Sequence, residues 1–306
     1  MNRHTVSGRW KLGLALIFLT AFQFGILPII LKILLRKLDP FTLSWYRYAI
    51  AVGFLGLLSF RQYDLLAPYR LRGRRLFLLI VATLGLCANF VLYTLGLDYS
   101  TPNTAQVLFQ LAPMLLLVGG LLIFKESFSI RQGLGLGILI LGLILFFDGK
   151  YDEILTGAST LWLGILLTAM STALWACYGL AQKQLLRHLS GRAIMFTIYC
   201  AGTWDLPDLG TAASGPDTDA PGVGSVGRVL DHAGDRICQP GSRDESPGGL
   251  SRQCRIGNTP LFTVGGVAIL APIFPAYVQA ETISSLTALG IVFVVVGSVL
   301  ASLKKS

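Results

Sequence analysis

A duplicated stretch constrains this chain more than any other feature of its sequence. Residues 126–142 read ESFSIRQGLGLGILILG, and residues 281–297 read ETISSLTALGIVFVVVG. Both begin with Glu, any residue, Phe or Ile, and Ser, followed by five residues, Gly, six residues and Gly. A second pair repeats in the same order, because residues 32–38 read KILLRKL and residues 183–189 read KQLLRHL. Two matches in one order predict a structural unit that occurs twice in the chain.

The apolar runs of the chain are long enough to cross a membrane. Of the 306 residues, 53% are hydrophobic and only 13% are charged, whereas soluble domains carry roughly 25% charged residues. A helix of about 20 apolar residues spans a hydrocarbon core ~30 Å thick. The predicted fold class is therefore an all-α polytopic membrane protein. The runs that we expect to be helices are 12–35, 41–60, 76–97, 104–124, 133–147, 161–182, a run that begins at Pro260, and 284–303.

The fifth of these runs is short and rich in glycine. Its Gly133 and Gly137 are four residues apart and form a face of small residues. Such a face lets two helix backbones approach closely in lipid. We therefore expect these two glycines to lie at a helix–helix contact.

The net charge of +9 indicates topology rather than binding to nucleic acid, because lysine and arginine flank the apolar runs. With the N-terminus in the cytoplasm, the loops on that side hold fifteen basic residues and the opposite loops hold four, residues 203–259 left aside. Cytoplasmic loops of membrane proteins carry such an excess. The sequence thus predicts that both termini are cytoplasmic.

Motifs of catalysis and of metal binding are missing from the sequence. The five cysteines have no metal-ligand spacing, and no G-x4-G-K-[ST] phosphate loop occurs. No nucleophile elbow or zinc-binding His-Glu helix is present either. We expect a protein that is not an enzyme and that needs no cofactor or metal.

Residues 203–259 differ abruptly from the rest of the chain. They hold eight of the sixteen acidic residues, ten glycines and five prolines. The chain nevertheless keeps the length of the repeat, since Leu38 to Glu126 is 88 residues and Leu189 to Glu281 is 92. We interpret this segment as translated out of frame, because a shift of one base turns each of its seven aspartates into Ile, Met or Thr. The alternative is a disordered cytoplasmic loop, which leaves the matching length unexplained.

Several ordered motifs resemble those of the EamA-domain branch of the drug/metabolite transporter superfamily. Residues 38–51, LDPFTLSWYRYAIA, are similar to the D-P-x6-R-[FY] second helix of that family. Residues 92–114 are similar to its turn between helices three and four, and residues 121–142 to its L-G-E-x-[LF]-S signature. TPLFTVGGVAIL and ETISSLTALGIVFVVVG match the end of its second repeat. The resemblance covers about residues 1–202 and 260–306.

This resemblance implies ten transmembrane helices, of which about eight are recognisable, in two EamA repeats at residues 12–147 and 161–303. It also implies a secondary transporter of the inner membrane that exports a small metabolite by alternating access, with the substrate bound near the midplane. The partners that it implies are the lipid bilayer and an amino-acid-like or other polar solute, not nucleic acid; a homodimer is left open. The alternative is a protein that does not transport, because residues 203–259 interrupt its second repeat.

Polar and aromatic side chains inside the predicted helices are the candidate substrate contacts, since such residues are costly in lipid unless they face a cavity or a partner. For the amides, the alternative is a hydrogen bond that merely ties two helices together. For Arg47, it is a side chain that reaches back to the membrane surface. The candidates are Gln23, Arg47, Asn89, Tyr93, Gln106, Gln110, Trp175 and Tyr178.

Overall fold

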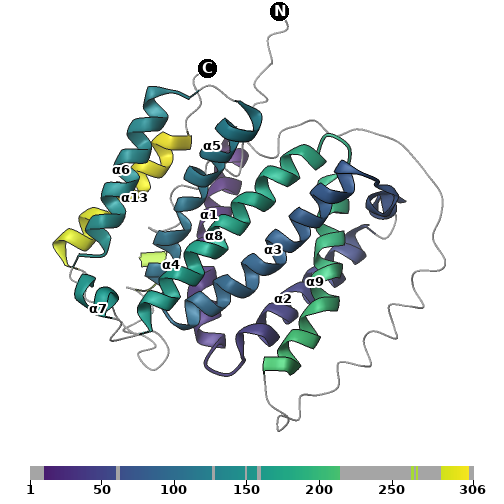
Figure 1. The fold of residues 1–306 in the computed structure, drawn as a ribbon, viewed down its shortest axis with the longest axis horizontal. Helices are drawn as coiled ribbons and strands as arrows, with labels where there is room; N and C mark the ends of the chain where they lie inside the picture. Colours follow the sequence, from purple (N-terminus) through teal and green to yellow (C-terminus); the bar gives the residue numbers. More distant parts are fainter. Residues whose placement is uncertain are drawn as a thin grey trace, which may run out of the picture.

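All regular structure that the computed structural model describes is helical (Figure 1). The described residues are 10–59, 63–125, 128–148, 150–156, 160–213, 263–264, 267 and 284–302. Four stretches are long and apolar enough to cross a membrane, namely Pro40–Leu58, Arg74–Asp98, Pro102–Phe124 and Leu161–Leu185. Shorter apolar helices cover Phe22–Leu34, Ile130–Phe146 and Ser285–Ala301. These findings confirm the predicted fold class.

The first three predicted helices form close to their expected bounds. They are α1 (Trp10–Leu34), α2 (Pro40–Ser59) and α3 (Arg74–Asp98). The start of α2 is fixed by Asp39, whose Oδ2 accepts hydrogen bonds from the backbone N–H groups of Phe41 (3.1 Å) and Thr42 (2.9 Å). A carboxylate at this position satisfies amides that have no partner within the helix.

The predicted helix at 104–124 forms as one apolar stretch, Pro102–Phe124, which is interrupted at Gln110. The structure has α4 (Pro102–Phe109) and α5 (Leu111–Phe124), which meet at Gln110. The physical reason is Pro113, which has no N–H to donate to the carbonyl of Phe109 four residues earlier. Thr101 caps α4 by accepting a hydrogen bond from the N–H of Thr104 at 3.2 Å.

Two predicted loops contain short helices. The basic loop after α2 includes the 3-10 helix η1 (Tyr63–Arg70), and the polar loop before residue 161 includes α7 (Tyr151–Thr156). Between α5 and α7 lies α6 (Ile130–Phe146), whose first turn is closed by a capping box of Ser129 and Gln132.

The second half of the chain contributes α8 (Leu161–Leu185), α9 (Gly191–Ala213) and α13 (Ser285–Ser302). The sequence offered only an apolar run of ten residues at 193–202, too short to span, but α9 has 23 residues. Helix hydrogen bonds form within the segment itself, so α9 continues beyond the end of the apolar run. Residues 214–262 lie outside the described part of the chain, as does most of the predicted helix that begins at Pro260.

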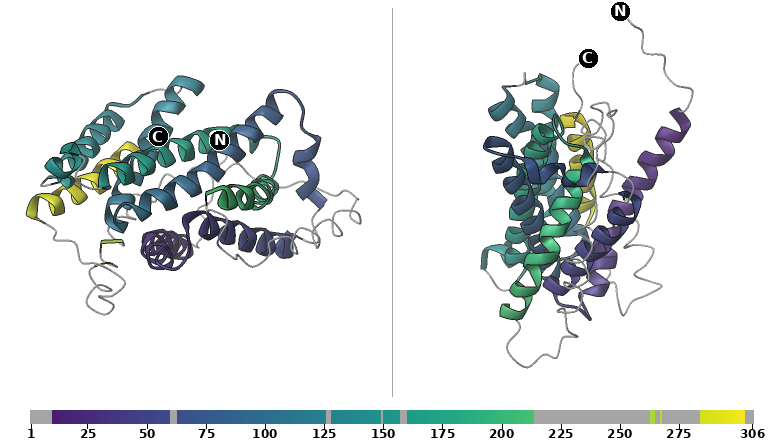
Figure 2. Two further views of the ribbon diagram at one scale, coloured as in Figure 1. Left: turned by 60° about the horizontal axis from the view of Figure 1, so that its bottom comes forward. Right: turned by 90° about the vertical axis from the view of Figure 1, so that its right-hand side faces the viewer.

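The three most extensive contacts between described helices join distant parts of the sequence (Figures 1 and 2). Helix α6 packs along α13 at one edge of the bundle, α3 along α8 in the middle, and α2 along α9 at the other edge. Each pair brings an element from the first half of the chain against one from the second half. The two halves therefore share one bundle.

Helices α6 and α13 meet through the four glycines of the duplicated motif. A Cβ on Gly142 would lie 2.5 Å from the N of Val294, and a Cβ on Gly297 would lie 2.7 Å from the carbonyl oxygen of Gly135. Only glycine permits so close an approach. The expectation for Gly133 and Gly137 was wrong, because a Cβ on Gly137 would meet open space and one on Gly133 would meet only the side chain of Phe128.

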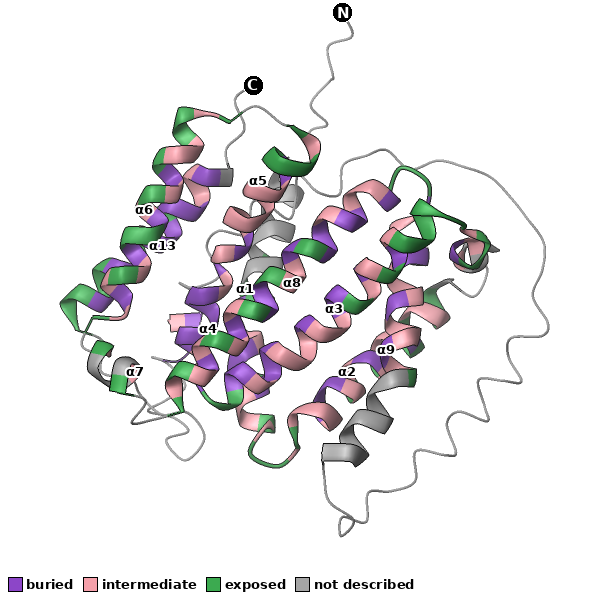
Figure 3. Ribbon diagram, in the orientation of Figure 1, coloured by how far each residue is buried: buried purple, intermediate pink, exposed green. Residues whose placement is uncertain are grey.

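Burial follows the bundle (Figure 3), with buried residues on the faces where helices meet and exposed ones on the outside. Many of the exposed side chains are large and apolar, such as Leu57 (78% exposed) and Ile130 (82% exposed). Water would disfavour this surface, whereas lipid covers it at no cost. The outer surface thus fits a bilayer.

Candidate functional site

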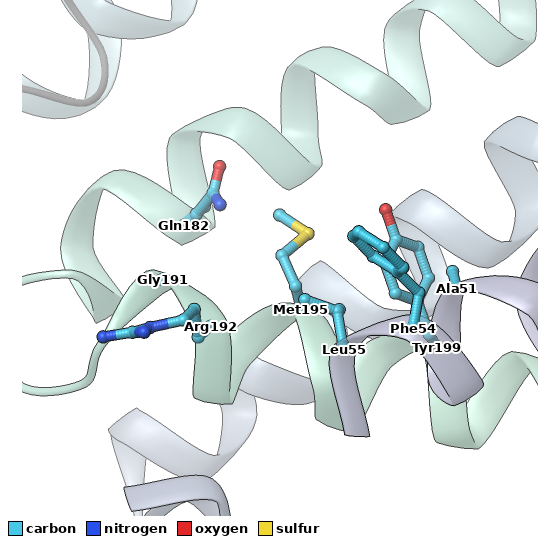
Figure 4. Close-up of a pocket in the computed structure, with 8 residues that line it drawn as sticks. All are labelled: Ala51, Phe54, Leu55, Gln182, Gly191, Arg192, Met195 and Tyr199. Carbon is cyan, nitrogen blue, oxygen red and sulfur yellow. The ribbon is translucent and has the colours of Figure 1, made fainter. Parts of the chain in front are cut away.

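A cavity of about 760 Å³ opens between α2, α8 and α9 (Figure 4). Gln182 of α8 and Met195 of α9 project into it, with Phe54 and Tyr199 at one end and Arg192 at the other. Its lining residues are Ala51, Phe54, Leu55, Gln182, Gly191, Arg192, Met195 and Tyr199.

Helical spacing brings these side chains to one place. Residues 51, 54 and 55 fall on one face of α2, and residues 192, 195 and 199 fall on one face of α9, because positions three and four apart lie above one another. Gln182 is only 6% exposed, so its amide is a buried polar group that faces the cavity. The walls combine apolar surface with a few polar groups, as small-molecule sites do.

Arg47 lies on α2 one helical turn before Ala51, which lines the cavity. It is therefore closer to the start of α2 than the residues of the cavity wall are. Its Cζ is 4.3 Å from the centroid of the Phe90 ring on α3, which places the guanidinium against an aromatic face. Its Nη1 is buried and finds no hydrogen-bond partner among the described residues. Both observations favour a guanidinium that points into the bundle over one that reaches back to the membrane surface.

Tyrosines surround this guanidinium and link it to the cavity. The Tyr48 ring lies 5.3 Å from Phe90 and 5.9 Å from Tyr199, measured between centroids. The Tyr48 hydroxyl donates to the backbone carbonyls of Leu86 and Cys87, each at 3.3 Å. Tyr199 thus contributes to both the cavity wall and the surroundings of Arg47.

Two of the predicted amides tie helices together. Asn89 on α3 donates from Nδ2 to the backbone oxygen of Ser171 (2.8 Å) and to its Oγ (3.2 Å) on α8. Gln110, between α4 and α5, accepts at Oε1 from the Ser298 hydroxyl of α13 at 2.9 Å. Both contacts favour the interhelical alternative over a free substrate contact.

The predicted aromatic residues form packed contacts. Rings of Tyr93, Phe109 and Trp175 meet edge to face, with centroids 5.7 Å and 5.5 Å apart. The Tyr178 hydroxyl lies 3.6 Å from the sulfur of Met195, which links it to the cavity wall. The three rings lie at the junction of α3, α4 and α8.

The remaining two candidates, Gln106 and Gln23, differ in their burial. Gln106 is 5% exposed on α4, and Gln23 is exposed on α1. None of the eight predicted residues lines the cavity itself. Tyr178 contacts the wall residue Met195, and Arg47 is connected to the wall residue Tyr199 through the rings of Phe90 and Tyr48.

Sequence reasoning missed the polar residues of the cavity wall. Gln182 follows Tyr178 by four residues, so helical periodicity offered a signal for it. Tyr199 and Met195 were missed because the run at 193–202 was interpreted as an isolated stub. Among the described residues, no group of three or more His, Cys, Asp or Glu could hold a metal ion.

Comparison with known proteins finds a family match in the first half of the chain. Residues 11–148 match the model of the EamA-like transporter family. A protein of Haemophilus influenzae named an uncharacterized transporter is 34% identical over 190 residues. The Escherichia coli uncharacterized inner membrane transporter YhbE is 36% identical over 191 residues. The first half of the chain thus matches the EamA-like transporter family.

The matches to these two relatives cover only part of each protein. They span 61% of this chain, and 61% and 59% of the two relatives, so the chain spans about three fifths of their length. A solved crystal structure superposes with a TM-score of 0.52 at 17% identity, over 92% of this chain and 96% of that one. At this identity the superposition shows a similar fold.

Proposed function

We propose that this protein is a secondary transporter of the EamA type that exports a small polar metabolite with a carboxylate, such as an amino-acid-like solute. The observation that carries the proposal is the position of Arg47, whose buried Nη1 lacks a hydrogen-bond partner among the described residues. The cavity between α2, α8 and α9 is the proposed substrate route. Arg47 lies beyond the end of the cavity that is lined by Ala51.

The cost of a buried charge supports a role in binding. An arginine in the middle of a transmembrane helix costs about 2.5–3.5 kcal/mol on insertion scales. Stacking on Phe90 offsets part of this cost, and a carboxylate that accepts two guanidinium hydrogen bonds offsets more. We infer that Arg47 binds the substrate carboxylate, while Gln182 and Tyr199 contact its polar groups.

The cavity lies toward one end of the bundle. Its lining residues come from the last turns of α2 and α8 and the first turns of α9. The distribution of basic residues supports a cytoplasmic location for this end. An opening to the cytoplasm would load substrate for export, which is the direction that we propose, across the inner membrane.

Helix pairing supports alternating access between two inverted repeats at residues 12–147 and 161–303. Under that division α2 and α9 are equivalent helices, as are α6 and α13, and each packs against its own equivalent. Contacts of this kind are expected when a two-fold axis relates two halves. Rocking of one half against the other would then expose the site to each side in turn.

The test is solute transport by the purified full chain in proteoliposomes loaded with a panel of labelled amino acids and neutral polar solutes. We expect exchange of a carboxylate-bearing solute by the wild type. Arg47→Gln should reduce exchange at least tenfold, and Arg47→Lys should retain part of it because the charge remains. Arg131→Gln is the control, because Arg131 is exposed on α6. Equal exchange by Arg47→Gln and the wild type would refute the role of Arg47.

The second candidate function is a membrane protein that does not transport. The composition of residues 203–259 favours it, since a cavity needs helices from both repeats. A chain with the frame restored across this segment separates the two candidates in the same assay. Exchange by both chains supports transport by this protein, whereas exchange by the restored chain alone supports the second candidate.

A further inference from the structure

A second pocket lies at one end of the bundle, separate from the cavity of the proposed substrate route. Its volume is about 390 Å³, and it is lined by the first turns of α3, the end of α5, and the end of α8 with the residues that follow it. Four of its lining side chains are three arginines and a histidine, namely Arg74, Arg75, Arg187 and His188. No described residue that lines it carries a carboxylate. The pocket therefore has a strongly positive rim.

Below this rim the wall of the pocket is apolar. Leu78, Phe124 and Leu185 line it together with Ile123, which is 55% exposed. Large apolar side chains continue from there along the outside of the bundle, with Phe77 63% exposed on α3 and Leu122 72% exposed on α5. The pocket is thus continuous with surface that faces lipid.

The start of α3 adds to the positive potential. Its N-cap is Gly73, which has no side chain to accept a hydrogen bond from the first amides of the helix. The first four N–H groups of a helix have no partner within it, and the helix dipole places a partial positive charge at this end. An anion at the pocket would satisfy these amides together with the arginines.

The position of the pocket at the ends of two transmembrane helices favours a lipid headgroup as the anion. Helices α3 and α8 are both long enough to cross the membrane, and the pocket lies where α3 begins and α8 ends. This is the level at which lipid headgroups meet the protein. Basic pockets between transmembrane helices bind headgroups of this kind.

We propose that this pocket binds the phosphate headgroup of an anionic phospholipid. The headgroup phosphate accepts hydrogen bonds from Arg75 and Arg187, and the acyl chains lie on the apolar surface near Ile123. A free phosphate ion would satisfy the rim but would leave that apolar surface uncovered, so the lipid is the better fit. The site is distinct from the substrate route and does not depend on transport.

The test is lipid binding by the full chain, purified in a neutral detergent and titrated in native mass spectrometry with phosphatidylglycerol or phosphatidylcholine. We expect the wild type to bind phosphatidylglycerol in preference to phosphatidylcholine. The variant Arg75→Gln/Arg187→Gln should weaken binding of phosphatidylglycerol roughly 30-fold. Both side chains are exposed, so the variant should remain folded, which size-exclusion chromatography checks.

The control removes the same charge elsewhere, in the variant Arg70→Gln/Arg131→Gln. Both of these arginines are exposed and neither lines the pocket. An equal loss in the two variants would indicate general attraction to basic surface and would overturn the proposal. Unchanged binding in Arg75→Gln/Arg187→Gln would overturn it as well.

A separate titration uses inorganic phosphate in lipid-free detergent and measures the melting temperature. It distinguishes a pocket that binds a free phosphate ion from one that binds a lipid headgroup. Stabilisation by millimolar phosphate that the pocket variant loses, without binding of phosphatidylglycerol, would assign the pocket to a soluble anion and overturn the lipid assignment. Binding of phosphatidylglycerol that depends on Arg75 and Arg187 supports it.

Discussion

Gly142 on α6 and Gly290 on α13 face each other so closely that a Cβ on either would lie 2.8 Å from the carbonyl oxygen of the other. In the duplicated motif Gly142 is the second glycine of its copy, and Gly290 is the first glycine of the other copy. Gly135 and Gly297 also meet. Gly135 is the first glycine of its copy and Gly297 is the second glycine of the other copy, so this contact joins the same two motif positions with the copies exchanged. The duplicated motif is therefore a self-complementary helix contact.

We expect Gly142→Ala to destabilise the protein. The new Cβ would lie 2.5 Å from the N of Val294, so α6 and α13 would have to move apart, and overpacking of this kind costs about 1–3 kcal/mol. Gly137→Ala on the same helix is the control, because its Cβ would meet open space. Helix propensity favours Ala over Gly by up to ~1 kcal/mol, so the control should be neutral or stabilising. Melting temperatures in detergent measure both, and equal shifts would contradict the close contact.

We expect Asn89→Ala to weaken the packing of α3 on α8 more than Ser171→Ala does. The shorter hydrogen bond of Asn89 goes to the backbone oxygen of Ser171, which Ser171→Ala retains. Interhelical hydrogen bonds in membranes average about 0.6 kcal/mol. The double variant should lose as much stability as Asn89→Ala alone, because both substitutions remove the same hydrogen-bond network. Denaturant titration of the single and double variants measures this, and additive losses would count against the shared network.

We expect both termini in the cytoplasm. A green fluorescent protein fused after Ser306 should fluoresce, and alkaline phosphatase at the same place should be inactive. Alkaline phosphatase fused after Thr156 should be active, because that loop lies on the side with few basic residues. The opposite pattern at both positions would reverse the orientation and place the cavity opening outside.

We expect the gene to have gained or lost a base near each end of codons 203–259. Resequencing codons 195–265 from independent clones measures this directly. Restoring the frame should also give a chain that is less prone to aggregate in detergent, because apolar helices would replace a segment with eight acidic residues. If resequencing confirms the reading frame of the printed sequence, the frameshift hypothesis is wrong and residues 203–259 are a genuine insert.

The sequence by itself determined the class of the fold and most helix bounds. Apolar length, caps such as Asp39 and the flanking basic residues are local properties, and they act within one segment. Even the break at Gln110 has a local cause in Pro113. The motifs that resembled the EamA family are also local, and the family match over residues 11–148 confirmed those of the first half.

Only the tertiary structure decided which polar side chains meet. Asn89 and Ser171 are 82 positions apart, and Gln110 and Ser298 are 188 apart, so no periodicity within one helix relates them. The pairing of α2 with α9 likewise created the cavity and left Arg47 facing inward. Helix packing depends on the shapes and hydrogen-bonding groups of segments that are distant in the chain. A single sequence shows which residues each segment contains, but it does not show which segments pack together.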